Sequence, residues 1–274
     1  MDDLIRAAIL GIVQGLAEFL PISSSGHLIL VPALFGWDDQ GLAFDVGLHL
    51  GTLLALLAYF WRDWLTMATS GLRDLKGHGL RYRSFAPESQ LLWLIALGSI
   101  PAAVVGLLFD DWIEQNVRQP WVVAIALAVV GTIMLFADSV SRRTRSIDSV
   151  GVWDAVLIGL AQATALIPGV SRSGATITAA LFRDFSRDAA ARFAFLLGTP
   201  AFVGAAALKA PDLADLSGNE AGQLAVGFVC SAVVGFAAIH FLLRYLRTRS
   251  LLPFVGYRYL VAALTLIIGA IRVS

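Results

Sequence analysis

One interruption in an apolar segment decides the fold of this chain: the sequence EFLPISSSGH at residues 18–27. The residues before it form an apolar run that could begin to cross a membrane. The interruption then brings in a carboxylate, a helix-breaking proline, three hydroxyl groups, a glycine and an imidazole. Non-helical backbone at membrane depth is tolerated only where protein or water satisfies its polar groups. We therefore expect this stretch to lie inside a helix bundle and to face a cavity.

The composition is that of a polytopic, all-α membrane protein. Of the 274 residues, 58% are hydrophobic and only 15% are charged. A soluble domain is rarely so apolar. The formal net charge is zero, so we expect no nucleic-acid partner. The single cysteine, Cys230, excludes an intrachain disulfide and a cysteine-rich metal site. The first residues lack the pattern of a removable signal peptide, and we expect none.

Six apolar runs are each close to the ~20 residues that a helix needs to cross the hydrocarbon core. We expect full spans at about 41–61, 90–109, 119–137, 191–208, 222–243 and 254–272. Two further regions, 3–36 and 150–184, are apolar but interrupted near the middle. Each of these two regions is either one broken span or a re-entrant helical hairpin.

Charge placement separates these alternatives, because Lys and Arg mark the cytoplasmic side of a membrane protein. The basic segments are 62–89, 138–149, 183–190 and 244–253. The other connections are acidic and contain Asp38, Asp39, Asp110, Asp111, Glu114, Asp212, Asp215 and Glu220. Only two re-entrant hairpins, the first entering from outside and the second from the cytoplasm, put every basic segment inside. Both termini then lie outside.

The two halves of the chain resemble each other. A shift of 148 residues places GIVQ at 11–14 on GLAQ at 159–162, and SSSG at 23–26 on SRSG at 171–174. Three expected spans separate the hairpins, and this odd number makes the repeats inverted in the membrane. Chance similarity among apolar segments is the alternative. We expect one membrane domain over 1–274, with repeat one at about 1–137 and repeat two at about 150–274.

Each interruption has the residues of an anion site. A proline ends the first half-helix, and the serines and glycine after it suit the cap of a second one. The amides and positive dipole at the new helix N-terminus attract anions. We expect a phosphate-type ligand to be held by residues of both breaks: Ser23, Ser25, Gly26, Ser171, Ser173 and Gly174.

Three charged or amide side chains extend this site. Arg172 lies in the second break, and an arginine inside a membrane is a functional candidate by default. Its planar fork fits phosphate, and the alternative is a structural partner for Glu18. Glu18 follows Gln14 by four residues, so both lie on one helix face. Glu18 is a metal ligand, a general base or the counter-ion of Arg172, and Gln14 is a neutral metal ligand or an interhelical hydrogen-bonding residue.

The attacking group is not decided by the residues alone. His27 lies one turn after Ser23 and is either a hydrogen-bonded structural residue or a nucleophile or proton carrier. Of the serines at 23–25, we expect one to cap, one to donate to phosphate and one to attack. A second group of polar residues, on one face of the next span, is expected behind the site: Asp45, His49 and Thr52.

The chain resembles the undecaprenyl-pyrophosphate phosphatase family, also known for bacitracin resistance. Two motifs carry the likeness, QGLAEFLPISSSGH at 14–27 and PGVSRSGAT at 168–176, and HLGT at 49–52 fits the same pattern. The likeness covers nearly the whole chain. It implies a phosphatase of the bacterial cytoplasmic (inner) membrane that removes the terminal phosphate of the C55 lipid carrier diphosphate on the periplasmic side. This activity would recycle the carrier for peptidoglycan synthesis.

By position, the resemblance implies that Glu18, His27 and Arg172 are essential and that Ser24 is a nucleophile or phosphate ligand. It adds Thr176 to the substrate-binding residues. It also implies a divalent cation, Mg²⁺ or Ca²⁺, near Glu18 and Gln14. The family has Glu or Gln at the position of Gln14, so this chain has one carboxylate fewer for a metal. We therefore expect the cation to arrive on the diphosphate.

Three functions stay open at this point. The first is the lipid diphosphatase, with a polyprenyl diphosphate and membrane lipid as partners and a homodimer as an open alternative. The second is a transporter or flippase of an anionic or phosphorylated lipid, and the third is a channel. The serine, histidine, glutamate and arginine together argue against a channel, which needs no nucleophile. Phosphate release separates the first two, and Ser24, His27 and water all stay open as the attacker.

Overall fold

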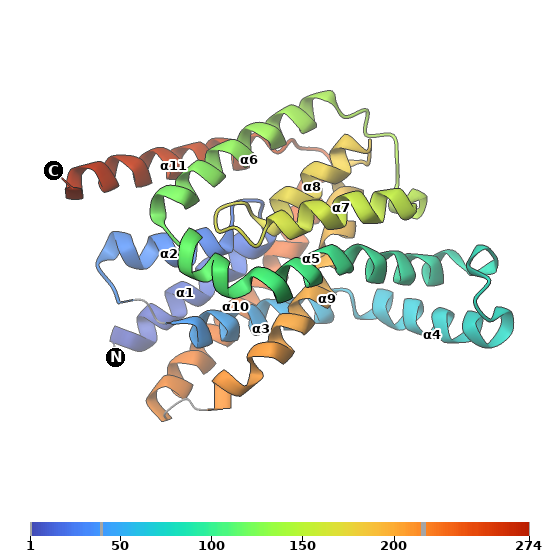
Figure 1. Cartoon of the computed structure of the whole chain (residues 1–274), viewed down its shortest axis with the longest axis horizontal. Coiled ribbons are helices and arrows are strands. Elements are labelled where there is room, and N and C mark those ends of the chain that lie inside the picture. Colours follow the sequence, from blue (N-terminus) through green and yellow to red (C-terminus); the bar gives the residue numbers. More distant parts are fainter. Residues whose placement is uncertain (1, 39–40, 215–217, 274) are drawn as a thin grey trace.

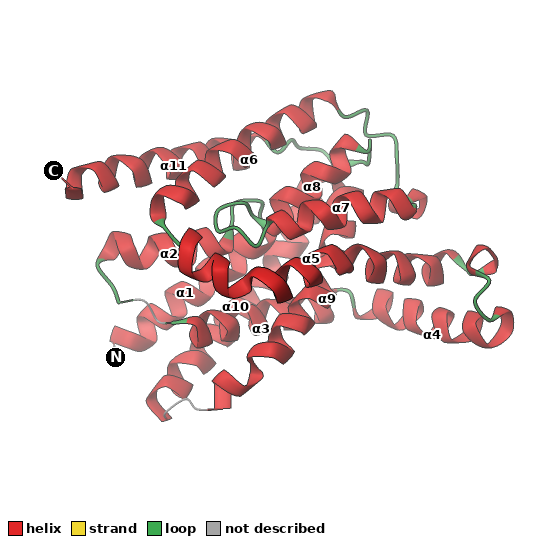
Figure 2. Cartoon of the chain, viewed as in Figure 1, coloured by secondary structure: helices red, strands yellow, loops and turns green. Residues whose placement is uncertain are grey.

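The computed structural model describes residues 2–38, 41–214 and 218–273, and these residues form a helical bundle without β-strands (Figures 1 and 2). Asp39 and Asp215, two of the expected acidic connections, lie outside the described residues. The α-helices are α1 (Asp2–Phe19), α2 (Ser24–Phe35), α3 (Leu42–Tyr59), α4 (Trp61–His78), α5 (Pro87–Val117), α6 (Pro120–Val140), α7 (Val152–Thr164), α8 (Arg172–Phe182), α9 (Arg187–Ala214), α10 (Gly218–Leu246) and α11 (Leu252–Val273). Two short 3₁₀ helices, η1 (Tyr82–Ser84) and η2 (Ile147–Ser149), lie in the connections.

Five of the six expected spans correspond to described helical segments that are long and apolar enough to cross a membrane. These segments are Pro87–Phe109, Pro120–Val140, Arg187–Leu208, Gly218–Leu246 and Leu252–Gly269. The sixth, expected at 41–61, corresponds to α3, which qualifies as a candidate span only together with α4, across a bend of 70°. The described chain therefore has five candidate spans, or six if the bent pair is counted as one.

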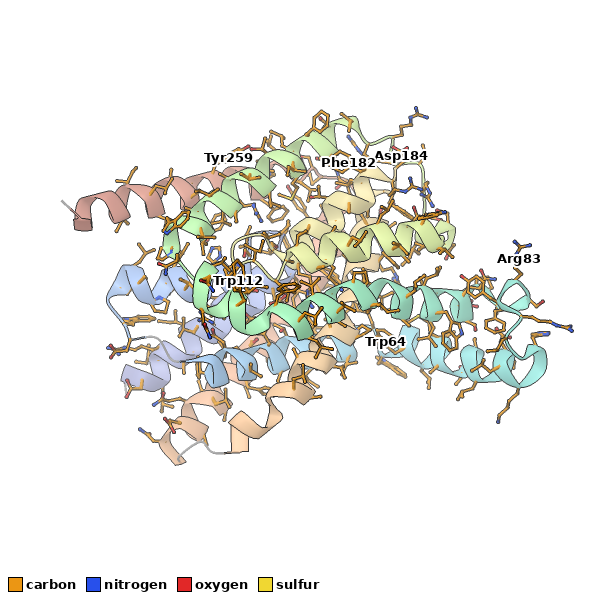
Figure 3. All side chains as sticks on the ribbon, viewed as in Figure 1. Trp64, Arg83, Trp112, Phe182, Asp184 and Tyr259 are labelled. Atoms are coloured by element: carbon orange, nitrogen blue, oxygen red, sulfur yellow. The ribbon has the colours of Figure 1, made fainter. Side chains whose placement is uncertain are left out.

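The segment 62–89 differs from the expectation of a basic connection, because α4 and the start of α5 form within it. The helix α4 is amphipathic, with polar and charged residues interspersed among apolar ones. It therefore has no continuous apolar run by which it could be recognised in the sequence. Together, α4 and the first half of α5 extend beyond the rest of the bundle, with Arg83 at the tip (Figure 3).

Two short helix pairs turn back on themselves at the predicted interruptions. α1 packs against α2 across residues 20–23, and α7 packs against α8 across residues 165–171. In Figure 1 the α1–α2 pair opens toward one end of the bundle and the α7–α8 pair toward the other, with the two breaks between them. The hydroxyl of Ser173 donates to the carbonyl of Leu20 at 3.2 Å. The two interruptions are therefore in direct contact.

Glycine allows the first helix of each pair to approach its neighbour. A Cβ atom on Gly11 of α1 would lie 2.3 Å from the carbonyl oxygen of Gly227 in α10. On Gly159 of α7, it would lie 2.1 Å from the carbonyl oxygen of Gly98 in α5. Small residues let membrane helices pack closely. Gly11 and Gly159 are also the residues that the 148-residue shift aligns. On the outside, large apolar side chains such as Leu108, 69% exposed, suit a lipid environment.

Candidate active site

The carboxylate of Glu18 is the centre of a buried polar network between the two breaks. Its Oε1 accepts a hydrogen bond from Nη2 of Arg172 at 2.6 Å. Its Oε2 accepts from Oγ of Ser24 at 2.6 Å and from Nε2 of Gln14 at 2.8 Å. Nε2 of His49 lies 3.4 Å from the same oxygen. The network thus joins the end of α1, the starts of α2 and α8, and the middle of α3.

Arg172, the first residue of α8, is held by three groups. Besides Glu18, its Nη1 donates to the carbonyl of Gly198 in α9 at 3.1 Å, and its guanidinium carbon lies 3.4 Å from the ring centroid of Phe202. The ion pair with Glu18 is the partnership that the sequence left as an alternative to ligand binding. A guanidinium group has five N–H donors, so this ion pair and a contact with phosphate are compatible.

A capping serine begins the second half-helix in both breaks, as predicted. Oγ of Ser23 accepts from the amide of Gly26 at 3.4 Å, and Oγ of Ser171 accepts from the amide of Gly174 at 3.1 Å. The φ angles of the two serines, 77° and 73°, lie in a region that residues other than glycine rarely adopt. Such backbone strain costs about 1–3 kcal/mol and clusters at functional sites. The two breaks therefore share one unusual backbone geometry.

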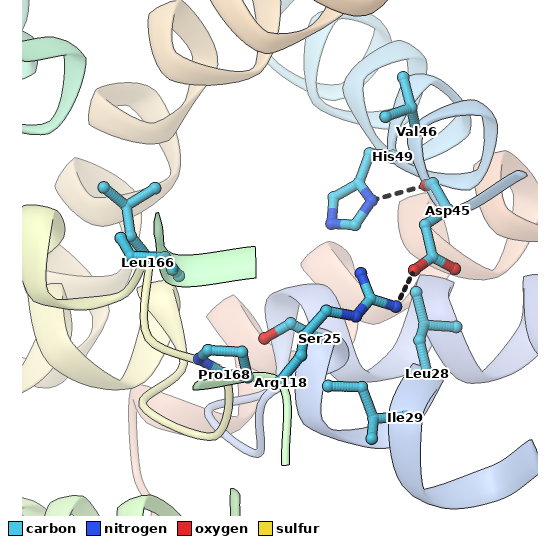
Figure 4. Close-up of a pocket in the computed structure, with 10 residues that line it drawn as sticks. Ser25, Leu28, Ile29, Asp45, Val46, His49, Arg118, Leu166 and Pro168 are labelled. Carbon is cyan, nitrogen blue, oxygen red and sulfur yellow. Dashed lines mark hydrogen bonds and ion pairs between the residues drawn. The ribbon is translucent and has the colours of Figure 1, made fainter. Parts of the chain in front are cut away.

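The residue after each capping serine bonds to Glu18. In the first break this residue is Ser24, whose hydroxyl donates to Glu18, as a nucleophile does beside its base. In the second break it is Arg172, so a hydroxyl and a cation occupy equivalent positions. Ser25, one residue further, lines a cavity next to the network (Figure 4).

The remaining predicted ligand residues of the second break shape its backbone. Oγ of Ser173 lies 3.2 Å from Oγ of Ser171, in addition to its bond to Leu20. The hydroxyl of Thr176 donates to the carbonyl of Arg172 at 2.7 Å. These side chains hold Arg172 and the capping serine in place.

His27 is held beside the first break and does not contact Glu18. Its Nδ1 lies 2.7 Å from the carbonyl oxygen of Ser23, which can only accept, so this nitrogen carries the proton and donates. Its Nε2 lies 2.8 Å from the hydroxyl of Tyr257 in α11, and the two rings stack. The predicted catalytic role of His27 stays a prediction.

The expected second group lies on α3, and only His49 reaches the network. Nδ1 of His49 donates to the carbonyl of Asp45 at 2.7 Å, which leaves Nε2 facing Glu18. Thr52 is buried and donates to the carbonyl of His49 at 2.9 Å. The carboxylate of Asp45 pairs with Arg118 at 3.2 Å.

Arg258 of α11 belongs to the site although the sequence interpretation does not single it out. The residue is fully buried, and its described hydrogen bonds all go to backbone carbonyls, at 2.9–3.3 Å. The acceptors are Ala126 and Leu127 in α6, Pro21 in the first break, and Gly169 and Val170 in the second. Arg258 therefore ties both breaks to α6. Its role could have been predicted from the sequence, because Arg258 is a charged residue inside the apolar run 254–272 and such a residue needs partners within the protein.

The predicted divalent cation finds few ligands in the protein itself. No group of three His, Cys, Asp or Glu side chains that could hold a metal ion occurs among the described residues. Glu18 already pairs with Arg172. Gln14 is buried, and its Oε1 has no hydrogen-bond partner within the described part of the chain. One carboxylate and one amide oxygen fit Mg²⁺ only when phosphate oxygens complete the coordination.

Comparison with known proteins gives one consistent result. A family model described as "Bacitracin resistance protein BacA" matches residues 7–264. A Moorella thermoacetica protein named undecaprenyl-diphosphatase is 46% identical over 98% of each chain. Proteins of the same name from Rubrobacter xylanophilus and Hahella chejuensis are 48% and 45% identical, over 96% and 94% of this chain and 97% and 96% of their own lengths. The chain therefore belongs to the bacitracin resistance protein BacA family.

Proposed function

We propose that the chain is an undecaprenyl-diphosphatase, a membrane hydrolase that converts the C55 isoprenoid diphosphate and water to the monophosphate and inorganic phosphate. The hydrogen bond from Ser24 to Glu18, beside Arg172 of the other break, carries this proposal. It puts a hydroxyl, a base and a cation into one network, which neither a channel nor a flippase requires. The names of the relatives agree with this chemistry. The reaction recycles the lipid carrier for cell-wall synthesis and fits the bacitracin resistance in the family's name.

In the proposed mechanism, Oγ of Ser24 attacks the terminal phosphorus while Glu18 takes the hydroxyl proton. The bond to the bridging oxygen breaks, and the lipid monophosphate leaves with the proton that Glu18 took from Ser24. Water then attacks the phosphoserine while the ionised Glu18 takes a proton from the water. Glu18 returns this proton to Oγ of Ser24 as the bond between Ser24 and phosphorus breaks and phosphate is released. Arg172 and the first-turn amides of α2 and α8 stabilise the charge on the transferring group. His27 is less suited to attack, because Ser23 and Tyr257 hold its ring nitrogens, and it keeps the proposed role of proton carrier.

The cation, Mg²⁺ or Ca²⁺, belongs to the same proposal. Glu18 and Oε1 of Gln14 are the protein oxygens that would hold it together with the diphosphate, and the cation would neutralise part of the diphosphate charge. Chelation with EDTA should abolish turnover. Gln14→Glu adds a carboxylate and should lower the Mg²⁺ concentration that gives half-maximal activity. An unchanged Mg²⁺ requirement in this variant would remove Gln14 from the cation site.

We also propose the finer topology. The α1–α2 and α7–α8 pairs are re-entrant hairpins of two inverted repeats, at about 1–137 and 150–274, and six full spans surround them. The opposite directions of the two pairs and the contact between their breaks support this arrangement. The basic connections then lie in the cytoplasm, and the site opens to the periplasmic side of the inner membrane.

The test is phosphate release from C55 diphosphate by purified protein in detergent with Mg²⁺. Wild type should release one phosphate per monophosphate formed, and Arg172→Ala and His27→Ala should lose most of this activity. Arg192→Ala is the matched control, because Arg192 also pairs with a carboxylate, Asp63, and lies over an aromatic ring outside the site. Folded wild type that moved the lipid across vesicles without releasing phosphate would contradict the proposal and support a flippase.

A further inference from the structure

The polar network borders a cavity, and an apolar groove lies next to that cavity. The cavity, of about 160 Å³, is lined by Ser25, Asp45, His49 and Arg118, and Figure 4 shows these side chains around it. The groove, which we name the α5–α7 groove, has a volume of about 280 Å³. Its lining includes Phe109, Trp112 and Ile113 of α5, Thr164 at the end of α7, and Leu166 and Ile167 in the second break. Ile113 and Leu166 line both spaces, so the two are neighbours.

The cavity is polar and the groove is apolar, like the head and the tail of an amphiphile. The cavity has two ionised side chains and reaches the proposed catalytic network through His49, whose Nε2 is 3.4 Å from Glu18. The lining of the α5–α7 groove is almost entirely apolar, and Trp112 on its rim is 59% exposed. A charged head fits the cavity, and a hydrocarbon chain fits the groove.

Arg118 lines the cavity, as Ile113 and Leu166 do, but it does not line the α5–α7 groove. It follows the last turn of α5, five residues after Ile113, and its Nη2 donates to the carboxylate of Asp45 at 3.2 Å. The side chains of Arg118 and Asp45 are 24% and 15% exposed, so both remain accessible to a ligand in the cavity. A guanidinium group binds phosphate in the same bidentate way as carboxylate. A phosphate can therefore replace Asp45 as its partner.

We propose that the lipid diphosphate lies with its prenyl chain in the α5–α7 groove and its lipid-linked phosphate on Arg118, which exchanges Asp45 for that phosphate. The terminal phosphate then faces Ser24 and Arg172. This inference rests on the proposed function, because it orients the substrate of that same site. Asp45 holds Arg118 at the cavity until the substrate arrives, and the groove selects a long apolar chain.

The phosphate contact is tested with Arg118→Gln and Asp45→Asn in the phosphate-release assay. Arg118→Gln should raise KM for C55 diphosphate about tenfold, the loss expected for a charged hydrogen bond, and leave kcat nearly unchanged. Arg118→Lys should restore part of the affinity. Asp45→Asn should lower KM or leave it unchanged, because it removes the competitor. Arg6→Gln is the matched control, since Arg6 also pairs with an aspartate, Asp3, away from the cavity.

A merely structural ion pair gives a different result. Breaking it from either side would then change KM and kcat in the same direction in both variants. Equal losses in Arg118→Gln and Asp45→Asn, or a wild-type KM in Arg118→Gln, would overturn the assignment. If the wild type releases phosphate and either of these results is found, only the placement of the substrate is contradicted. If the wild type is folded and releases no phosphate, the proposed function itself is contradicted.

The contact between the prenyl chain of the substrate and the α5–α7 groove is tested with Thr164→Trp, which places a large side chain in the groove at an exposed position. KM for C55 diphosphate should rise several-fold, and KM for a C5 prenyl diphosphate should stay the same. Thr69→Trp is the matched control, because Thr69 of α4 is also exposed and its hydroxyl also bonds to a backbone carbonyl of its own helix. An equal rise in KM for both substrates, or no rise in KM for the C55 substrate, would show that the prenyl chain does not lie in the α5–α7 groove.

Discussion

The two breaks share a backbone and differ in charge. Ser23 and Ser171 cap their half-helices in the same way, with φ angles of 77° and 73°. The first break then carries the carboxylate of Glu18 and the hydroxyl of Ser24, whereas the second has Arg172 at the position of Ser24. One backbone geometry thus appears twice. In the proposed mechanism the first break supplies the attacking group and its base, and the second supplies the cation that stabilises charge. Under that proposal the site needs both breaks, because neither contains the complete set.

The largest expected effect comes from removing the cation of the second break. Arg172→Gln should lower kcat/KM about 10³-fold, because transition-state charge loses its strongest partner and Glu18 is left buried without a counter-ion. Arg172→Lys should recover only part, since lysine keeps the charge without the planar fork. Phosphate release measures both, with Arg192→Gln as the control. A loss of tenfold or less would mean that the second break contributes little to catalysis.

The second-largest expected effect is on stability, and it comes from replacing Arg258, which bonds to both breaks. Arg258→Met leaves five carbonyl groups without their donor and should lower the free energy of unfolding by about 3 kcal/mol. Arg258→Lys should lose less, because an ammonium group can still donate to some of these carbonyls. Chemical denaturation of the purified protein in detergent gives the measurement. Unchanged stability in Arg258→Met would show that the breaks hold their shape without this residue.

The smallest effect compares the two caps directly. Ser23→Ala and Ser171→Ala should each lower the free energy of unfolding by about 1 kcal/mol, the usual value of an N-cap. Ser25→Ala should cost less, since Ser25 lines the cavity and does not cap. The same denaturation experiment applies. Clearly different costs for the two capping serines would show that the breaks are not equivalent in energy, whatever their backbone angles.

Local features of the site could be predicted from the sequence. A proline followed by serines and a glycine predicts the end of one helix and the cap of the next. The serine caps are confirmed in both breaks. The helix end lies close to the proline only in the first break, because α1 ends at Phe19 whereas α7 ends at Thr164, four residues before Pro168. The spacing of Gln14 and Glu18 predicts their shared face, and the two side chains are hydrogen-bonded. Such predictions succeed because the contacts span only a few residues.

Contacts between distant segments were harder to predict. Tyr257 reaches His27 and Arg258 reaches Pro21 across more than 200 residues, and spacing carries no information at that separation. The helix α4 was missed for another reason, because its amphipathic sequence lacks a continuous apolar run. The charge of Arg258 within an apolar span was a usable signal, since such a residue needs partners inside the protein.

A double-mutant cycle between the two breaks tests whether they form one active site. Ser24→Ala in the first break and Arg172→Gln in the second are measured singly and together by phosphate release from C55 diphosphate. Residues that act as a unit are strongly non-additive. We predict that the double variant is little worse than the poorer single variant. Losses in kcat/KM that multiply, as for independent sites, would contradict the account.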